Sequence, residues 1–250
     1  MNKHYDVAII GAGISGIMTA YELAENSSDL SIALLEQGKS IYKRACPIIE
    51  GKVKECVNCP ACSIMKGFGG AGNFSDGKYN FTTAFGGWFN EYLPDKEVMD
   101  LINYVDEVNM KFGATKETYS TSTPEALKIE KLALQHDLHL LHAKVKHLGT
   151  ENNLQILKNM YDYLENKVQI ESDCAAKQID IREDGSYDLE MADGRTLNCK
   201  YLVVAPGRAG AEWFSNQCKN LDIPLLNNQV DIGVRVETND IVMEEINEAL

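Results

Sequence analysis

The first residues that could do chemistry are three glycines near the N-terminus, in the run GAGISG. Gly11 would allow a tight turn out of a strand, Gly13 would let the backbone approach a pyrophosphate, and Gly16 would let a helix pack closely on a sheet. The N-terminus of such a helix favours negatively charged phosphates. The pattern predicts a dinucleotide site, with a glycine-rich turn that holds no ligand as the alternative.

The carboxylate of Glu36 lies where the ribose of a dinucleotide would need a hydrogen-bond acceptor. Glu36 lies 20 residues beyond Gly16 and ends the second apolar run, so it could accept hydrogen bonds from ribose hydroxyls. An acidic residue here disfavours the 2′-phosphate of NADP. The candidate cofactor contacts around this motif are Gly11, Gly13, Ile14, Ser15, Gly16, Glu36 and Gln37.

A second glycine-rich run covers residues 67–78, with the sequence GFGGAGNFSDGK. Five glycines in eleven residues would present many backbone N–H groups to an anion or to the edge of a flavin. A flexible loop is the alternative. The interleaved Phe68 and Phe74 favour a fixed conformation.

Four of the seven cysteines fall within 17 residues, at Cys46, Cys56, Cys59 and Cys62. Three thiols at two-residue gaps could converge on one metal, with Cys46 as a fourth ligand. The ferredoxin spacing is not met, because no cysteine follows Cys62 at the required gap. An iron–sulfur cluster, a zinc ion, a redox-active dithiol and thiols without a shared role all stay open.

Candidates for catalysis are fewer, and no general base can be named. His147 ends a loose series of histidines without a metal-binding pattern such as HExxH. Arg235 and Glu237 alternate with apolar residues over 230–237, which predicts a half-buried strand. We take His147 and Arg235 as the first catalytic candidates to test.

These residues need a scaffold, and the apolar pattern predicts one. Residues 6–10 and 31–35 are expected to form buried strands around a helix at 17–24, a βαβ unit of about 30 residues. A further strand is expected at 168–173. Two tight-turn signals, Asp184-Gly185 and Asp193-Gly194, predict a β-meander over 175–205.

The rest of the chain predicts helices at 95–112, 123–136 and 150–165 and a strand at 138–148. Residues 38–90 are expected to form an ordered, functional loop region. Residues 241–250 predict an amphipathic helix without a stop signal. We therefore expect the chain to be the front part of a longer protein.

Composition narrows the class of protein. The 250 residues carry 24 basic and 37 acidic side chains, a net charge of −13. This charge argues against nucleic acid and against an anionic membrane surface as partners. No apolar run approaches the roughly 20 residues that span a bilayer, and the N-terminus lacks a secretory signal. With an odd number of cysteines as well, we expect a cytoplasmic protein without a disulfide framework.

The last strand of the meander carries a family resemblance. It ends in Ala205, Pro206 and Gly207, and this arrangement resembles flavoproteins related to glutathione reductase. The resemblance implies FAD rather than NAD in the first site, with contacts at these three residues.

Several motifs together resemble a bacterial and archaeal family of uncharacterised FAD-dependent dehydrogenases. They are GAGISG with Glu36, RACP at 44–47, CVNCPAC at 56–62, the run at 67–78, KHLGT at 146–150, VVAPG at 203–207 and VDIGVRVE at 230–237. The resemblance implies cofactor contacts at Arg44, Gly69, Gly70, Gly72 and Ser75. One feature departs from it, since no late Gly-Asp motif follows residue 207. Truncation or impaired FAD binding would explain this departure, and the fragment alone would then bind flavin weakly.

The sequence therefore predicts an α/β protein with a Rossmann-like FAD-binding fold, a parallel sheet plus a β-meander, and an inserted α+β region on the substrate side. The FAD domain would be discontinuous, from 1–90 and 150–220, with 91–149 and 221–250 forming the substrate side. The expected function is an FAD-dependent oxidoreductase that uses a small-molecule substrate or an electron donor such as NAD(P)H. An iron–sulfur or dithiol electron-transfer flavoprotein and a zinc-stabilised nucleotide-binding scaffold are the alternatives. The oligomeric state is left open.

Overall fold

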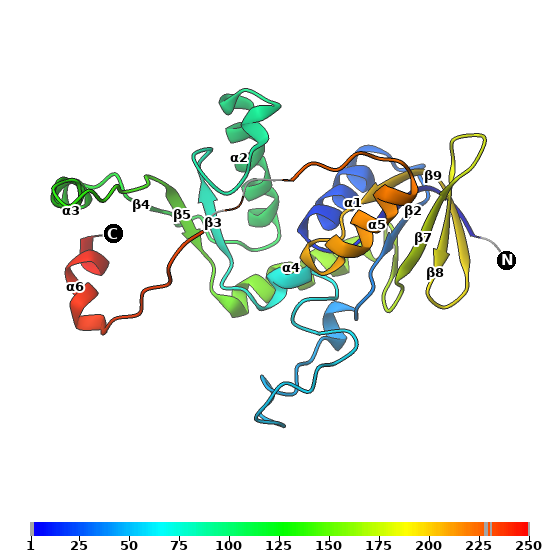
Figure 1. Ribbon diagram of the computed structural model, residues 1–250, viewed down its shortest axis with the longest axis horizontal. Helices are drawn as coiled ribbons and strands as arrows, with labels where there is room; N and C mark the ends of the chain where they lie inside the picture. The colour runs from blue at the N-terminus through cyan, green and yellow to red at the C-terminus, as the bar shows by residue number, and fades with distance from the viewer. Residues whose placement is uncertain (1–2, 228–229, 231, 250) are drawn as a thin grey trace. The chain divides into compact units, whose positions relative to one another are not determined.

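The computed structural model describes residues 3–227, 230 and 232–249. The chain divides into two compact units (Figure 1), the first from residues 1–75 and 153–226 and the second from 76–152 and 227–250. The expected border at residue 90 lies elsewhere in the structure, because the strand that follows residue 77 pairs within the second unit.

The first unit is built on a six-stranded sheet with the order β6-β2-β1-β9-β8-β7. β1 (Lys3–Ile10) lies between β2 (Ile32–Leu35) and β9 (Thr196–Val204) and is parallel to both. β2 is fully buried, as its continuous apolar sequence predicts for a strand inside a parallel sheet. Helix α1 (Ile14–Asn26) connects β1 to β2. The predicted βαβ unit is confirmed.

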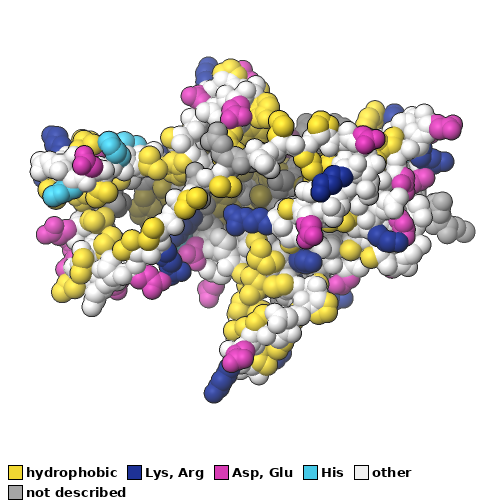
Figure 2. All heavy atoms as spheres, viewed as in Figure 1, with side chains coloured by type: hydrophobic (Ala, Val, Ile, Leu, Met, Phe, Trp, Pro, Cys, Tyr) yellow, Lys and Arg dark blue, Asp and Glu magenta, His cyan; other side chains and the backbone are white. Residues whose placement is uncertain are grey.

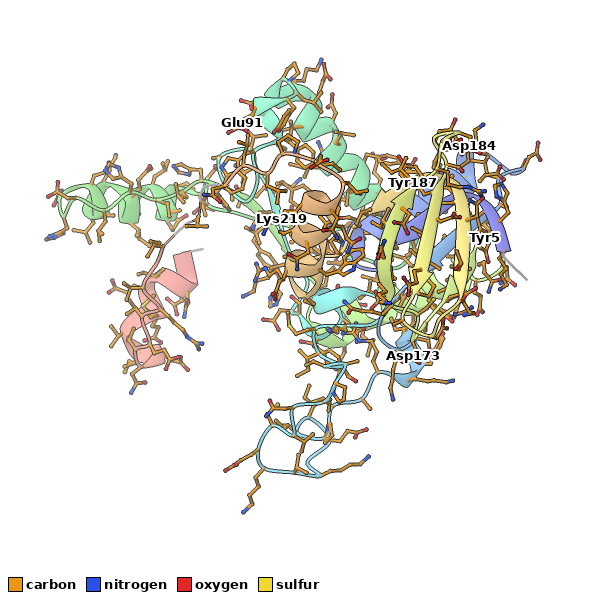
Figure 3. The ribbon with its side chains drawn as sticks, turned by 45° about the vertical axis from the view of Figure 1, so that its right-hand side comes forward. Tyr5, Glu91, Asp173, Asp184, Tyr187 and Lys219 are labelled. Carbon is orange, nitrogen blue, oxygen red and sulfur yellow. The ribbon has the colours of Figure 1, made fainter. Side chains whose placement is uncertain are left out.

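The remaining strands complete the predicted sheet. β6 (Gln169–Glu171) pairs in parallel with β2, while β7 (Ala176–Ile181), β8 (Tyr187–Met191) and β9 form an antiparallel meander. Asp184 marks the turn between β7 and β8 (Figure 3), where its carboxylate accepts hydrogen bonds from the backbone and hydroxyl of Ser186. The predicted fold class, a parallel sheet plus a β-meander in an α/β protein, is confirmed.

One apolar core joins the parallel strands to the meander. It contains side chains from β1, β2, β8 and β9, such as Ala8, Leu35, Leu189 and Leu197, each at most 2% exposed. Helix α5 (Ala211–Asn220) follows a short helix η4 (Arg208–Gly210) and packs Trp213 against this core. The core therefore fixes the position of the turns at both ends of β9.

The rest of the first unit consists of a long irregular segment and residues 153–164 of α4 (Thr150–Leu164), whose first three residues belong to the second unit. Among its described residues, this segment contains two short helices, η1 (Ile41–Lys43) and η2 (Gly70–Phe74). The loop region expected over 38–90 is interrupted further along by a strand at 78–81 and a short helix at 89–91. Between η1 and η2 the cysteine-bearing residues 46–62 run out from the sheet and expose a mixture of apolar and charged side chains (Figures 1 and 2).

The second unit contains a small antiparallel sheet with the order β3-β5-β4. Its strands are β3 (Lys78–Phe81), β4 (Tyr119–Ser120) and β5 (Lys144–His147), so the strand expected at 138–148 is shorter than predicted. Its helices are η3 (Phe89–Glu91), α2 (Asp95–Lys111), α3 (Pro124–Leu134) and α6 (Asp240–Ala249). The predicted helix at 241–250 is found as α6, except that Leu250 lies outside the described residues. None of the described helices is both long and apolar enough for a membrane crossing.

The half-buried strand predicted at 230–237 is wrong for the residues that the structure describes there, 230 and 232–237. These residues are not in a strand, and Ile232 is 95% exposed. Alternation of apolar and polar residues gives a strand only where another strand supplies backbone partners, and no described strand pairs with this segment. Asp231 lies outside the described residues.

Candidate functional site

Three turns of the first unit lie at the same edge of the sheet. Ile10 is level with Leu35 on one side and with Val204 on the other, so β1, β2 and β9 end together. The residues that follow these strands are the first glycine run, Glu36 and the Ala205–Gly207 turn. Ligands of open α/β sheets bind at the carboxyl ends of such strands.

Gly11 makes the contact between two of these turns. Its φ is +98°, and a Cβ here would lie 2.2 Å from the carbonyl oxygen of Ala205. The backbone N–H of Ala205 in turn donates to the carbonyl of Ile10 at 2.8 Å. Only glycine fits both the conformation and the space, so the predicted tight turn is present.

Gly16 and Gly13 behave differently. A Cβ on Gly16 would lie 1.9 Å from the carbonyl oxygen of Gly11, whereas a Cβ on Gly13 would meet nothing within 4 Å. Gly13 is the N-cap of α1 and provides no side-chain cap, so the first-turn N–H groups at Ile14 and Ser15 are available to a ligand. Both residues are exposed.

The second glycine run packs directly against the first. The N–H of Gly69 donates to the carbonyl of Ala12 at 2.8 Å, and a Cβ on Gly70 would lie 3.1 Å from the Cα of Gly13. Two segments more than fifty residues apart in the sequence thus form one backbone surface beside the N-terminus of α1. Gly72 and Ser75 follow on this segment and are exposed.

Glu36 is buried beneath these loops, with 4% of its surface exposed. Its Oε2 accepts the N–H of Ala12 at 2.9 Å, and its Oε1 accepts the N–H groups of Gly38 at 2.8 Å and Gly67 at 2.9 Å. A carboxylate has about four acceptor directions, so one remains for a ribose hydroxyl. Glu36 therefore orients both glycine loops as well as standing at the predicted ribose position, next to the partly buried Gln37.

Arg44 fixes the second glycine loop by donating hydrogen bonds to backbone carbonyl groups of that loop and of the residues just before it. Its Nη1 donates to the carbonyls of Phe68 at 2.8 Å and Gly70 at 2.7 Å, while Nε and Nη2 both donate to the carbonyl of Ser63. Burial lowers the pKa of Arg44 to about 10, against an opposing effect of the negative charge on Glu36, so the guanidinium stays charged at neutral pH. It also stacks over the ring of Phe74, 5.2 Å from its centroid.

Helix α4 supplies residues that the sequence analysis did not identify. Asn153 Nδ2 donates to the carbonyl of Gly72 at 2.7 Å and to that of Ser75 at 3.3 Å. Phe68 packs edge-on against Tyr161 with their ring centroids 4.9 Å apart. An asparagine in an amphipathic helix gives no sequence signal for this role, because the partners of Asn153 are carbonyls some eighty residues earlier in the chain.

The arrangement fits a dinucleotide with a flavin. The space in front of Gly13 and the first turn of α1 suits a pyrophosphate, and Glu36 retains an acceptor for a ribose. The Oδ1 atom of Asn73, in the second loop, is buried without a hydrogen-bond partner among the described residues. A donor group of a polar ligand bound beside the loop would satisfy this acceptor.

The cysteine cluster is not assembled in this structure. Cys56 and Cys59 are exposed, Cys46 and Cys62 are partly buried, and no group of three metal-ligating side chains converges among the described residues. The predicted use of these four cysteines as ligands of an iron–sulfur cluster or of zinc therefore has no support in the geometry.

The two catalytic candidates lie in the second unit and are solvent-exposed. His147 is the last residue of β5, and its preceding neighbour Lys146 is the buried one. The side chain of Arg235 is 87% exposed and pairs with Glu237 at 2.7 Å. Neither shows the burial or the polar environment that would single out an acid or base.

The segment that contains the first glycine run is similar in sequence to known proteins. A sequence model of the family described as FAD dependent oxidoreductase matches residues 6–45, which include the first glycine run, Glu36 and Arg44. Over this segment, which is 40 of the 250 residues, the chain is similar to that family. MymA of Mycobacterium tuberculosis, whose name describes an FAD-containing monooxygenase, is 57% identical over 37 residues, which are 15% of this chain and 8% of MymA.

Two solved enzyme structures are similar over a longer stretch. L-amino acid deaminase from Proteus vulgaris has 18% identity and a TM-score of 0.46, over 89% of this chain and 51% of the deaminase. Glycine oxidase from Geobacillus kaustophilus has 14% identity and a TM-score of 0.46, over 85% of this chain and 59% of the oxidase. The chain thus spans little more than half of either structure.

We expect Arg44→Lys to loosen the second glycine loop, because an ammonium has three donors and cannot reproduce the planar fork that reaches five carbonyl groups. The free energy of unfolding should fall by about 2–4 kcal/mol, and amide hydrogen exchange of residues 63–75 should become faster. Arg182→Lys, at a half-exposed arginine, is the matched control and should change neither. Unchanged exchange in Arg44→Lys would contradict this role.

The thiols should differ sharply in reactivity towards iodoacetamide at about pH 8. Cys56 and Cys59 should react at once in the native protein. Cys174 and Cys199 should react only after denaturation, because burial raises the pKa of both thiols to about 11. Peptide mass spectrometry measures each site. Protection of Cys56 and Cys59 that a chelator removes would instead reveal a bound metal.

Proposed function

We propose that the first unit binds FAD and that the protein is an FAD-dependent oxidoreductase. The observation that carries the proposal is the close packing of the two glycine runs beside the N-terminus of α1, with open space in front of Gly13. The family match over residues 6–45 and the identity with MymA over 37 residues support FAD as the ligand.

Each part of the site would have its own task. The pyrophosphate would lie on the N–H groups of Ile14 and Ser15, and a ribose hydroxyl would donate to Oε2 of Glu36. Arg44 would not touch the cofactor in this arrangement, because its donors already serve the carbonyls of the second loop. It would act as a positioning residue, and Gly69, Gly70, Gly72 and Ser75 would form the surface that faces the cofactor.

Ala205, Pro206 and Gly207 would close the site from the side of β9. Their turn is held against Gly11, so it cannot move without disturbing the first glycine run. The flavin itself would supply the hydride or electron transfer, while the protein would orient it and tune its potential.

The finer function is also a proposal. We propose a dehydrogenase that takes electrons from a small-molecule substrate or from NAD(P)H in the cytoplasm. The strong negative charge supports a small molecule over a nucleic acid or an anionic membrane surface as partner.

The intact protein should purify with the absorption bands of a flavin, or acquire them on incubation with FAD, and heat should release FAD that chromatography identifies. Anaerobic addition of NADH or NADPH should bleach these bands if a nicotinamide is the donor. Metal and acid-labile sulfide are measured on the same sample. A colourless protein that takes up no FAD would refute the proposal, and bound zinc in that sample would favour the nucleotide-binding scaffold.

Gly13→Ala separates cofactor binding from folding. The added methyl group meets no protein atom within 4 Å and the backbone conformation suits alanine, so the melting temperature should stay unchanged. The same methyl group would stand where the pyrophosphate approaches, so the Kd for FAD should rise by about tenfold or more, or about 1.4 kcal/mol.

Gly87→Ala is the matched control for this substitution, because it also adds a methyl group in open space but lies in the second unit. It should leave the Kd for FAD unchanged. Equal FAD affinity in Gly13→Ala and the unmodified protein would show that the ligand does not approach this turn.

A further inference from the structure

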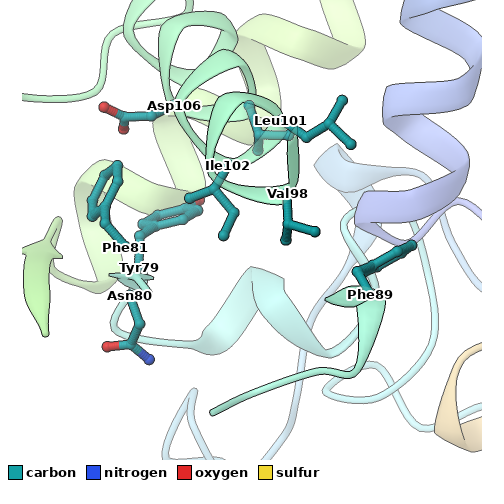
Figure 4. A pocket seen from close by; sticks show the side chains of 9 residues that line it. Tyr79, Asn80, Phe81, Phe89, Val98, Leu101, Ile102 and Asp106 are labelled. Atoms are coloured by element: carbon teal, nitrogen blue, oxygen red, sulfur yellow. The ribbon is translucent and has the colours of Figure 1, made fainter. Parts of the chain in front are cut away.

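The second unit contains an apolar hollow of about 440 Å³ (Figure 4). It lies between helix α2, strand β3 and the short helix η3. Its walls are three aromatic rings and a row of aliphatic side chains from α2, represented by Tyr79, Phe81, Phe89, Val98, Leu101 and Ile102. The volume is within the range of pockets that hold small molecules.

The hollow is not a simple gap in the core. Phe81 and Val98 are buried at 8% exposure, whereas Leu101 is 50% exposed and Phe89 is 66% exposed. In Figure 4 the side chains of Val98, Leu101 and Ile102 project from α2, and Phe89 lies on the side opposite Tyr79 and Phe81. The floor of the hollow is buried and apolar residues are exposed at its mouth. A ligand that removed these apolar residues from water would lower the free energy of the protein.

The charge at this hollow is already neutralised. Asp106 is its one charged lining residue, and both of its carboxylate oxygens accept hydrogen bonds from Lys146 Nζ, at 2.6 and 2.7 Å. Lys146 lies on β5 and is 1% exposed. Burial raises the pKa of Tyr79, so its phenol is neutral at physiological pH. A charged ligand would thus lose its hydration without gaining a counter-ion from the residues that line this hollow. The exposed Lys144 lies outside the lining, with its Nζ 5.3 Å from the centroid of the Phe81 ring.

A second hollow of about 310 Å³ adjoins the first and shares five residues with it, namely Tyr79, Asn80, Phe89, Val98 and Ile102. Its other walls are more polar and include Thr82, Thr83 and the exposed Lys78, which pairs with Asp76. The amide of Asn80 points away from α2 in Figure 4. Asn80 therefore stands at the border between an apolar compartment and one that can form hydrogen bonds.

We propose that this hollow is a binding site for an uncharged small molecule. Its ring-bearing apolar part would fill the space between Phe81 and Ile102, and an uncharged hydrogen-bonding end would reach Asn80. The match of three aromatic walls with a neutralised carboxylate selects this class over an ionic metabolite. The proposal does not depend on the flavin, because every residue that it uses lies in the second unit.

Two dyes that share one ring system test the proposal on the intact protein. N-phenyl-1-naphthylamine is uncharged, and 1-anilinonaphthalene-8-sulfonate carries an additional sulfonate. Fluorescence titration should give saturable binding of the uncharged dye, and the sulfonate should bind at least about tenfold more weakly. Absence of saturable binding of the uncharged dye, or equal affinity for the two dyes, would overturn the proposal.

Ile102→Trp locates the site, because the indole would occupy the space between α2 and β3. It should raise the Kd of N-phenyl-1-naphthylamine by about tenfold or more. Asn103→Trp is the matched control, since it places the same side chain on an exposed position of α2 that does not line the hollow, and it should leave the Kd unchanged.

Leu101→Asn is a second variant, and unlike Ile102→Trp it does not require the fold to accommodate a bulky side chain. Leu101 is half-exposed, so the fold should tolerate asparagine, while the loss of apolar surface should weaken binding of the uncharged dye several-fold. Circular dichroism and bound FAD are measured on every variant, so that loss of the fold, loss of flavin and loss of dye are distinguished. An unchanged Kd in both Ile102→Trp and Leu101→Asn would refute the site.

Discussion

Two buried, oppositely charged side chains hold the glycine-rich loops of the first unit in place. Glu36 accepts backbone N–H groups from Ala12, Gly38 and Gly67, and Arg44 donates to carbonyl groups between Ser63 and Gly70. Glycine loops lose much conformational entropy on ordering and have few side chains to pack. Charge-assisted hydrogen bonds to the backbone offset that cost, and they do so from beneath the surface that faces a ligand.

This arrangement depends on the sheet. Glu36 is placed correctly only because β2 ends level with β1, and the turn after β9 reaches Gly11 only because β9 ends level as well. The core between the parallel strands and the meander sets these registers. A shift of one residue along β9 would move the Ala205–Gly207 turn away from Gly11, so core packing and the shape of the nucleotide site are coupled.

Much of this unit can be predicted from sequence because its signals are local. The spacing of Gly11, Gly13 and Gly16 predicts the turn, and apolar runs with tight-turn signals predict the sheet and its meander. The roles of Arg44 and Asn153 could not be predicted in the same way. Their partners are backbone carbonyls, which every residue has, at sequence separations of about twenty and about eighty residues.

In both units, other sequence patterns predict features that the structure does not support. Alternation over 230–237 describes a strand that has no partner among the described strands, and the two-residue gaps between the cysteines describe ligands that do not converge. No sequence motif predicts the hollow beside α2, because its walls are aromatic and aliphatic residues of the kind that any core contains. Its neutral character comes from Lys146, which belongs to a different strand from the rings around it.

The pairing of β1 with β9 joins Tyr5 to Cys199, which are 194 residues apart in the sequence. On the ribosome, β1 is therefore made long before the strand that must flank it. At roughly 5–20 residues per second, about 10–40 s pass before residue 207 has been synthesised. During that interval the edge of β1 that later pairs with β9 has no strand beside it, and an unpaired edge of an apolar strand favours aggregation.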